Sequence, residues 1–88
     1  MAPGRSQWQA ERRGRHEMVA SVLSICKQPV NRNRIMHAGN FSSHTTRSYL
    51  ELVLKAGLVE LVKDGTIVTT AKGIAYLERY DSLQNMLA

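Results

Sequence analysis

The sequence has little cysteine and no long hydrophobic run. Its single cysteine, Cys26, excludes an internal disulfide framework and most cysteine-based zinc modules. Polar residues and glycine interrupt the longest apolar stretches, such as Leu58-Val59, within a few positions, which excludes a transmembrane helix. The first fifteen residues contain arginines but no apolar block, so they lack the middle region of a signal peptide. We therefore expect a cytoplasmic protein without a membrane partner.

The charge of the chain is unevenly distributed. A chain of 88 residues with 43% hydrophobic and 22% charged content is one small domain. Its net charge is +5, but residues 1–47 hold eight basic and two acidic groups (+6), whereas residues 48–88 hold four basic and five acidic groups (−1). A basic excess in one part suggests a polyanionic partner, and we expect a nucleoid-associated protein.

Residues 1–14 are polar and are predicted to form a flexible basic arm, while residues 15–88 are predicted to form the folded domain. At the start of the domain, apolar residues recur at spacings of three, four and seven, which is typical of one helix face: Val19, Val22, Leu23 and Cys26. Asn31 offers a cap for a short second helix, and Gly39-Asn40 would end it.

A third helix is predicted over residues 43–56. Ser42 or Ser43 provides the N-terminal cap, and Gly57 suits the left-handed conformation that follows many helices. The expected buried stripe of this helix contains four residues, Thr46, Leu50, Val53 and Leu54.

After Gly57 the apolar period changes from that of a helix to that of a strand. Two β-rich runs within residues 59–69 flank Asp64-Gly65, which predicts a hairpin with a two-residue type I′ turn and positive φ at both turn residues. Thr70 is the expected cap of a final helix that runs to about Met86. Its apolar stripe contains Ile74, Leu77, Tyr80, Leu83 and Leu87.

The predicted fold is mainly α with a small β-hairpin. A short helix, a glycine-containing turn and a longer helix are the parts of a helix-turn-helix, whose second helix enters the DNA major groove. A hairpin that follows them makes the arrangement a winged helix-turn-helix, with the hairpin as the wing. The fold thus assigns helix 43–56 to the major groove and hairpin 59–69 to the wing.

The third helix has polar side chains suited to base edges and phosphates. With the buried stripe turned inward, hydroxyls, an imidazole and one arginine remain near its N-terminal end: Ser43, His44, Thr45, Arg47 and Ser48. Glu51 is the exception on this face, because phosphate repels a carboxylate unless it pairs with a cytosine amino group or an arginine. A solvated helix face has a similar composition, so this pattern alone leaves DNA binding and simple exposure open.

Basic residues around this helix favour DNA binding. They occupy the arm, the entrance to the first helix, the first turn of the second helix and the wing turn: Arg12, Arg13, Arg15, Arg32, Arg34 and Lys63. The partner expected from them is double-stranded DNA.

Three segments of the chain resemble the small archaeal winged helix-turn-helix family of DNA-binding proteins, which includes transcriptional regulators. They cover residues 12–19, 49–60 and 69–77, and their most specific parts are Gly57-Leu58-Val59-Glu60 and Thr69-Thr70-Ala71-Lys72-Gly73. The resemblance implies DNA binding, often as a homodimer, with an antiparallel coiled coil of the last helix in several members. Here the residues after Thr70 are too few for a long coiled coil, but helices could still pair over two or three turns.

The final helix is the expected dimer interface, through the stripe of Ile74, Leu77, Tyr80, Leu83 and Leu87, because a small domain cannot bury every apolar group by itself. The main hypothesis is therefore a dimeric transcriptional regulator. Two alternatives stay open: a winged-helix module that binds other proteins, and an architectural DNA-binding protein without sequence preference.

We expect no enzyme activity, no cofactor and no metal site. The sequence has no glycine-rich phosphate loop and no close pair of carboxylates in an apolar setting. His16, His37 and His44 fall on three different predicted helices at spacings that match no metal-ligand motif, and Cys26 fits a core position. The sequence indicates no small-molecule effector.

Overall fold

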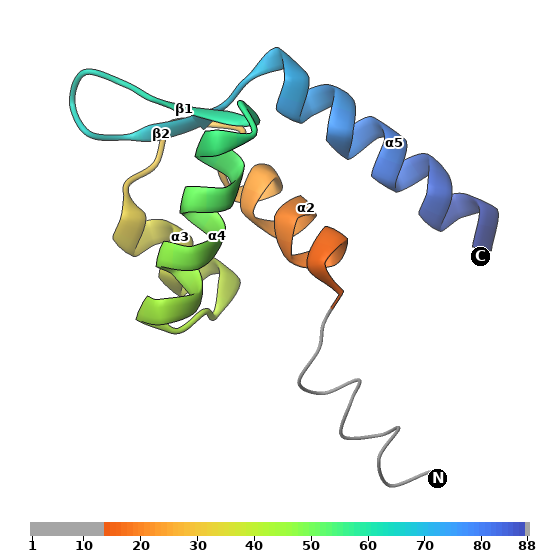
Figure 1. The fold of residues 1–88 in the computed structure, drawn as a ribbon, viewed down its shortest axis with the longest axis horizontal. Helices are drawn as coiled ribbons and strands as arrows, with labels where there is room; N and C mark the ends of the chain where they lie inside the picture. Colours follow the sequence, from red (N-terminus) through yellow and green to blue (C-terminus); the bar gives the residue numbers. More distant parts are fainter. Residues whose placement is uncertain (1–13, 88) are drawn as a thin grey trace, which may run out of the picture.

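A computed structural model describes residues 14–87, so the predicted basic arm, including Arg12 and Arg13, lies outside the described residues. The element order is helix, helix, helix, hairpin, helix (Figure 1): α2 Arg15–Ile25, α3 Arg32–Gly39, α4 Ser43–Lys55, β1 Val59–Leu61, β2 Ile67–Thr69 and α5 Ala71–Leu87. This order confirms the predicted winged helix-turn-helix, mainly α with one antiparallel hairpin.

The helix ends follow from local chemistry. The Asn31 side chain accepts a hydrogen bond from the backbone N–H of Arg34 at 2.8 Å and caps α3, and Asn40 ends this helix with a φ of 56°. The Ser42 hydroxyl accepts from the backbone N–H of Thr45 at 3.0 Å and caps α4, and Gly57 follows it with a φ of 76°. The predicted caps are confirmed, with Ser42 rather than Ser43 at the start of α4.

The hydrophobic core surrounds α2, which packs against α3, α4 and α5. The predicted α2 stripe of Val19, Val22, Leu23 and Cys26 is fully or almost fully buried. Ile35 of α3, Leu50 and Val53 of α4, and Ile67 of β2 complete the centre. Burying such side chains is the main source of stability in a domain of this size.

The predicted buried stripe of α4 is wrong at one position. Thr46, Leu50 and Val53 are buried as expected, but Leu54 is 40% exposed. On the other side of the stripe, Tyr49 and Leu52 are half-buried and pack against the core. The inward face of α4 is therefore turned toward Tyr49 and Leu52, which pack against the core and leave Leu54 at the edge of the buried stripe.

The wing, defined as residues 59–69, has a longer turn than predicted. Leu61 pairs with Ile67, and the Val62 N–H donates to the carbonyl of Thr66 at 2.7 Å, which leaves a three-residue turn over 63–65. Only Gly65 has positive φ there, at 87°, so the two-residue type I′ turn is wrong. The Asp64 carboxylate instead accepts hydrogen bonds from the Thr66 N–H at 3.1 Å and from the Thr66 hydroxyl at 2.7 Å. These side-chain bonds stabilise a turn in which Asp64 does not need positive φ.

A third extended segment joins the hairpin, and sequence analysis did not predict it. Val30 pairs with Ile67 through two backbone hydrogen bonds of 3.1 and 2.8 Å. Thr69 donates its N–H to the carbonyl of Cys26 and its hydroxyl to the carbonyl of Leu23. These bonds tie β2 to the α2–α3 connection and hold the wing beside the start of α3.

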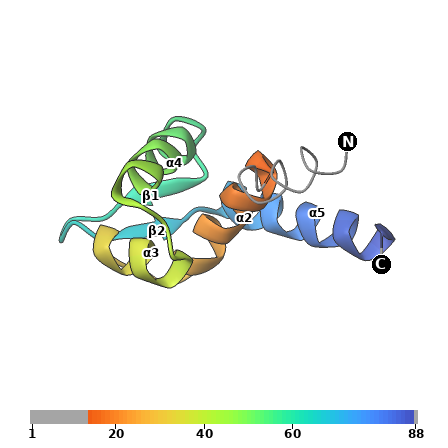
Figure 2. The same ribbon diagram turned by 90° about the horizontal axis from the view of Figure 1, so that it is seen from below.

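The last helix begins against the hairpin and then leaves the body of the domain. The Thr70 hydroxyl accepts from the Gly73 N–H at 3.2 Å, as a capping residue does. Gly73 lies so close to β1 that a Cβ there would overlap the carbonyl of Leu58 and the side chain of Thr69. Beyond Tyr80 every described residue is exposed, and the end of α5 diverges from α2 and projects away (Figures 1 and 2).

Candidate nucleic-acid interface

The outer face of α4, defined as His44, Arg47, Ser48, Glu51 and Lys55, is exposed. Ser43 is exposed beside it, in the first turn of the helix. Thr45 is half-buried, and its hydroxyl accepts from the Ser42 hydroxyl at 3.0 Å, so it belongs to the cap. Four of the five predicted groove residues, Ser43, His44, Arg47 and Ser48, are therefore accessible.

The basic side chains at this end have no internal partner. Within residues 14–87, Arg47, Arg32 and Lys63 form no side-chain hydrogen bond or ion pair. Lys72 differs, because its Nζ donates to the carbonyl of Ala56 at 2.7 Å and closes the end of α4. An unpaired surface cation is available to an external anion such as a phosphate.

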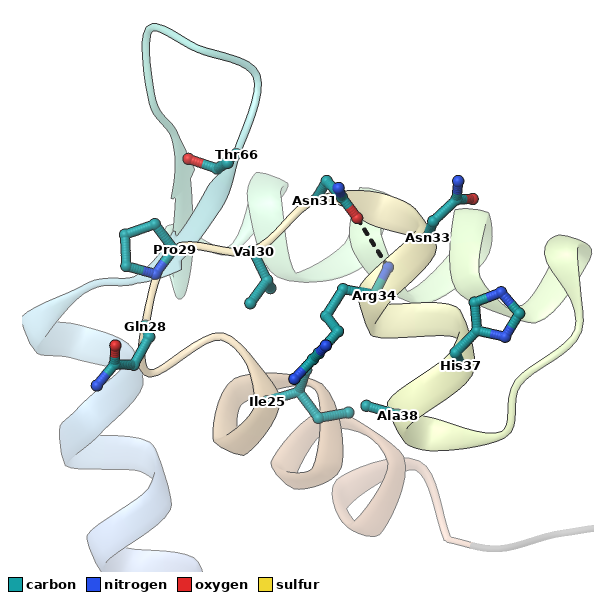
Figure 3. A pocket seen from close by; sticks show the side chains of 10 residues that line it. All are labelled: Ile25, Gln28, Pro29, Val30, Asn31, Asn33, Arg34, His37, Ala38 and Thr66. Carbon is teal, nitrogen blue, oxygen red and sulfur yellow. Dashed lines mark hydrogen bonds between the residues drawn. The ribbon is translucent and has the colours of Figure 1, made fainter.

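The two arginines at the start of α3 point to different places. Arg32 borders a shallow hollow beside the wing, together with Asn31, Leu61 and Gly65. Arg34 points toward Ile25 of α2 and lines a separate hollow (Figure 3). Arg32 therefore lies beside the wing, whereas Arg34 does not share that surface.

The hollow around Arg34 lies between the end of α2, the Pro29 connection and α3. Its lining holds one guanidinium, one imidazole, several amides and no carboxylate (Figure 3): Ile25, Gln28, Pro29, Val30, Asn31, Asn33, Arg34, His37, Ala38 and Thr66. It is wide and open, and most of the side chains that line it are exposed, so it encloses no small molecule in the way that cofactor sites do.

The tip of the wing carries one charge of each sign. Lys63 is exposed, and the neighbouring Asp64 carboxylate is held by Thr66. The hydrogen bond from the Thr66 hydroxyl, and then that from its N–H, lower the pKa of Asp64. The carboxylate is thus oriented into its own turn, which leaves Lys63 as the exposed charge of the tip without a hydrogen-bond partner among residues 14–87.

Arg15 is separated from this end of the molecule. It is the first residue of α2, and that end of the helix faces α5, away from α3, α4 and the wing (Figures 1 and 2). Arg12 and Arg13 lie outside the described residues. Of the predicted basic set, Lys63 lies in the wing turn, Arg32 lies beside the wing and Arg47 lies on α4, whereas Arg34 and Arg15 lie elsewhere.

A largely apolar groove, the α2–α5 groove, occupies the opposite end. Its lining combines aromatic and aliphatic groups from both helices: His16, Tyr76, Arg79, Tyr80, Leu83, Gln84, Met86 and Leu87. His16 Nδ1 and the Tyr76 hydroxyl are hydrogen-bonded at 2.7 Å, and the two rings stack with centroids 6.1 Å apart. Burial, and then the neighbouring Tyr80, raise the pKa of the Tyr76 phenol.

The predicted dimer residues divide between this groove and the core. Tyr80, Leu83 and Leu87 line the groove, while Ile74 is exposed outside it. Leu77 is only 7% exposed because it packs into the core of its own chain, so it offers little surface to a second copy. The prediction omitted His16, Tyr76 and Met86; the spacing of Tyr76 four residues before Tyr80 was the available signal.

Histidine, cysteine and acidic residues form no cluster at either end. Within residues 14–87 no three of these side chains lie close enough together to hold a metal ion. Cys26 is buried, and burial raises the pKa of its thiol to about 11, which makes it unreactive. Over the same part of the chain, no helix has both the length and the apolar character needed to span a bilayer.

The chain belongs to the winged helix-turn-helix family, whose sequence profile matches residues 12–88. A solved structure with the same fold is Sso10a-2, a DNA-binding protein from Sulfolobus solfataricus, at a TM-score of 0.68. The two chains are 20% identical, and the match covers 84% of each. The search of curated proteins gives no match.

Proposed function

We propose that this protein binds double-stranded DNA and inserts the N-terminal half of α4 into the major groove. The observation that carries the proposal is the outer face of α4, where His44, Arg47 and Ser48 are exposed and have no partner within residues 14–87. Arginine and hydroxyl groups match the acceptors and donors of base edges, and the helix N-terminus favours phosphate. The fold shared with Sso10a-2, which is named a DNA-binding protein, supports the same function.

Arg32 and Lys63 are the proposed phosphate contacts beside α4. Both are exposed and both lack an internal partner within residues 14–87. Arg32 borders the hollow beside the wing, and Lys63 lies in the wing turn. Phosphate contacts fix the position of a protein on the duplex, while base contacts select the sequence. The proposed role is transcriptional regulation on the nucleoid, without catalytic activity.

A homodimer formed through α5 completes the proposal. Leu83, Met86 and Leu87 are 60, 79 and 85% exposed, and such side chains on a projecting helix favour contact with another apolar surface. A two-fold pair uses the same surface on both chains, and would present two α4 helices to half-sites about 34–36 Å apart. The apolar groove also suits a different protein partner, which is the alternative that the binding experiment separates.

A salt titration of duplex binding tests the proposed function. Fluorescence anisotropy is measured with a random-sequence duplex and with a duplex selected by the protein from a random library. The affinity should fall by about 0.9 log units per log unit of salt for each phosphate contact. A preference for the selected duplex indicates a regulator, and equal affinities indicate architectural binding. Absence of binding to either duplex at micromolar protein in low salt would contradict DNA binding and favour the protein-interaction module.

A further inference from the structure

Glu51 is the acidic residue of α4, and its carboxylate is free. It is exposed on the outer face, with Arg47 four residues before it and Lys55 four residues after it. Within residues 14–87 neither cation forms an ion pair with it, and it accepts no hydrogen bond. The other acidic residues of this range lie on α2, β1, the wing turn and α5, so Glu51 alone would accompany α4 into a groove.

A carboxylate in this position needs a hydrogen-bond donor on the DNA. Phosphate oxygens repel it, and burying a carboxylate in an interface without a hydrogen bond costs free energy. The major groove offers two amino donors, cytosine N4 and adenine N6. Adenine sets the N7 acceptor beside its amino group, and this acceptor opposes a carboxylate, whereas cytosine presents a donor without an adjacent acceptor.

Arg47 supplies the complementary contact one helical turn away. Its guanidinium suits the O6 and N7 acceptors of guanine. Four residues of helix span about 6 Å, and successive bases are about 3.4 Å apart, so Arg47 and Glu51 reach bases within about two steps of each other. The two side chains have opposite charges and hydrogen-bonding roles, which together select a guanine and a cytosine.

We infer that Glu51 is a specificity-determining residue that reads a cytosine amino group within two base-pair steps of the guanine read by Arg47. The inference rests on the proposed function, because it requires α4 in the major groove. A target site read in this way contains G·C pairs at its centre. The contact also explains why an acidic side chain lies on a surface that otherwise suits a polyanion.

Selection of bound duplexes from a random library, repeated with two variants, tests the inference. Wild type should select a cytosine at one position of the motif. Glu51→Gln should move that position to adenine, because an amide can donate to N7 and accept from N6. Glu78→Gln removes the same charge from an exposed site on α5 and should leave the motif unchanged.

Direct titration with a modified base gives the size of the effect. N4-methylcytosine keeps its Watson–Crick pair but replaces the hydrogen that faces the major groove, and at the selected position it should weaken wild-type binding about tenfold. The same substitution should change the affinity of Glu51→Gln by less than about twofold.

The outcomes separate the inference from the proposed function. If the wild type binds DNA but Glu51→Gln selects the same motif, the proposed role of Glu51 is overturned and DNA binding is not. The same conclusion follows if the wild type binds all duplexes with equal affinity. Failure of wild type to bind any duplex overturns the proposed function and the inference with it. A circular-dichroism melt of each variant verifies that the fold is unchanged, which is expected because Glu51 and Glu78 are both exposed.

Discussion

The two ends of the domain differ in what they leave exposed. At the end formed by α3, α4 and the wing, the exposed groups include unpaired cations, hydroxyls and an imidazole. At the end formed by the start of α2 and the second half of α5, they include two leucines and a methionine, which lie beside two half-buried tyrosines in the groove. One surface is suited to a hydrated polyanion and the other to an apolar partner.

The charge asymmetry of the sequence explains only part of the separation between these two surfaces. The basic half of the chain also contains Arg15, which lies at the apolar end, and Arg34, which points toward α2. The acidic half contains Lys63, which lies at the tip of the wing. Position in the fold, rather than position in the sequence, separates the two surfaces.

The largest expected effect comes from a residue that supports both ends. Leu23 is fully buried on α2, the helix that packs against α3, α4, α5 and β2, so Leu23→Ala should lower the free energy of unfolding by about 3 kcal/mol. Urea unfolding followed by circular dichroism measures this loss. Leu83→Ala is the control, because Leu83 is 60% exposed and its removal should change the stability of a dilute monomer by less than about 0.5 kcal/mol. Equal losses would show that the projecting half of α5 is part of the folded core.

A charge in the α2–α5 groove should weaken dimerisation and, as a consequence, lower the affinity for DNA. Leu83→Asp adds a charge to the α2–α5 groove and should convert the proposed dimer to a monomer of unchanged fold, as measured by light scattering. Affinity for a two-half-site duplex should fall about a hundredfold, because the second contact is no longer linked to the first. Ser82→Asp, at a neighbouring position on α5 outside that groove, is the matched control. A dimer that persists in Leu83→Asp would refute the assignment of this groove.

Removing the arginine of the outer face should weaken DNA binding without changing assembly. Arg47→Ala should cost about 1–3 kcal/mol of binding free energy if Arg47 reads a base, and should relax the preference at one position. Lys27→Ala removes a charge of the same sign from the exposed turn after α2 and should have little effect on affinity. Uniform weakening across all sequences would instead identify Arg47 as a phosphate contact.

The smallest expected effect is a change in the salt dependence of DNA binding when one of the two arginines of α3 is replaced. Arg32 borders the wing and should contribute one phosphate contact, so Arg32→Ala should reduce the slope of log affinity against log salt by about 1. Arg34 points toward Ile25, and Arg34→Ala should leave the slope unchanged. The reverse result would mean that DNA approaches the hollow beside α2 and not the wing.

Local chemistry made much of the fold predictable. Asn31, Ser42 and Gly57 act on backbone groups within a few residues, so their caps are visible in the sequence. The turn of the wing was harder, because the bonds from Thr66 to Asp64 allow a conformation that the Asp-Gly pattern does not reveal. The pairing of Val30 with Ile67 joins distant parts of the chain and has no local signal.

The surfaces were less predictable than the elements. Both Leu52 and Leu54 are apolar, and only their neighbours in space decide which one α4 turns inward. Arg32 and Arg34 are two positions apart on one helix, which places them on different sides of it, although both were assigned to one contact surface. The α2–α5 groove requires His16 and Tyr76, from helices that meet only in the folded chain.

The most direct test is a nitrogen–proton NMR titration of the labelled protein with a duplex. We expect the amide signals of residues 43–48, Arg32 and the wing turn to shift on binding. The signals of residues 76–87 should keep their positions once the dimer is formed. Shifts confined to α5 and the first turn of α2, or the absence of any shift at α4, would contradict the assignment of DNA to the polar end.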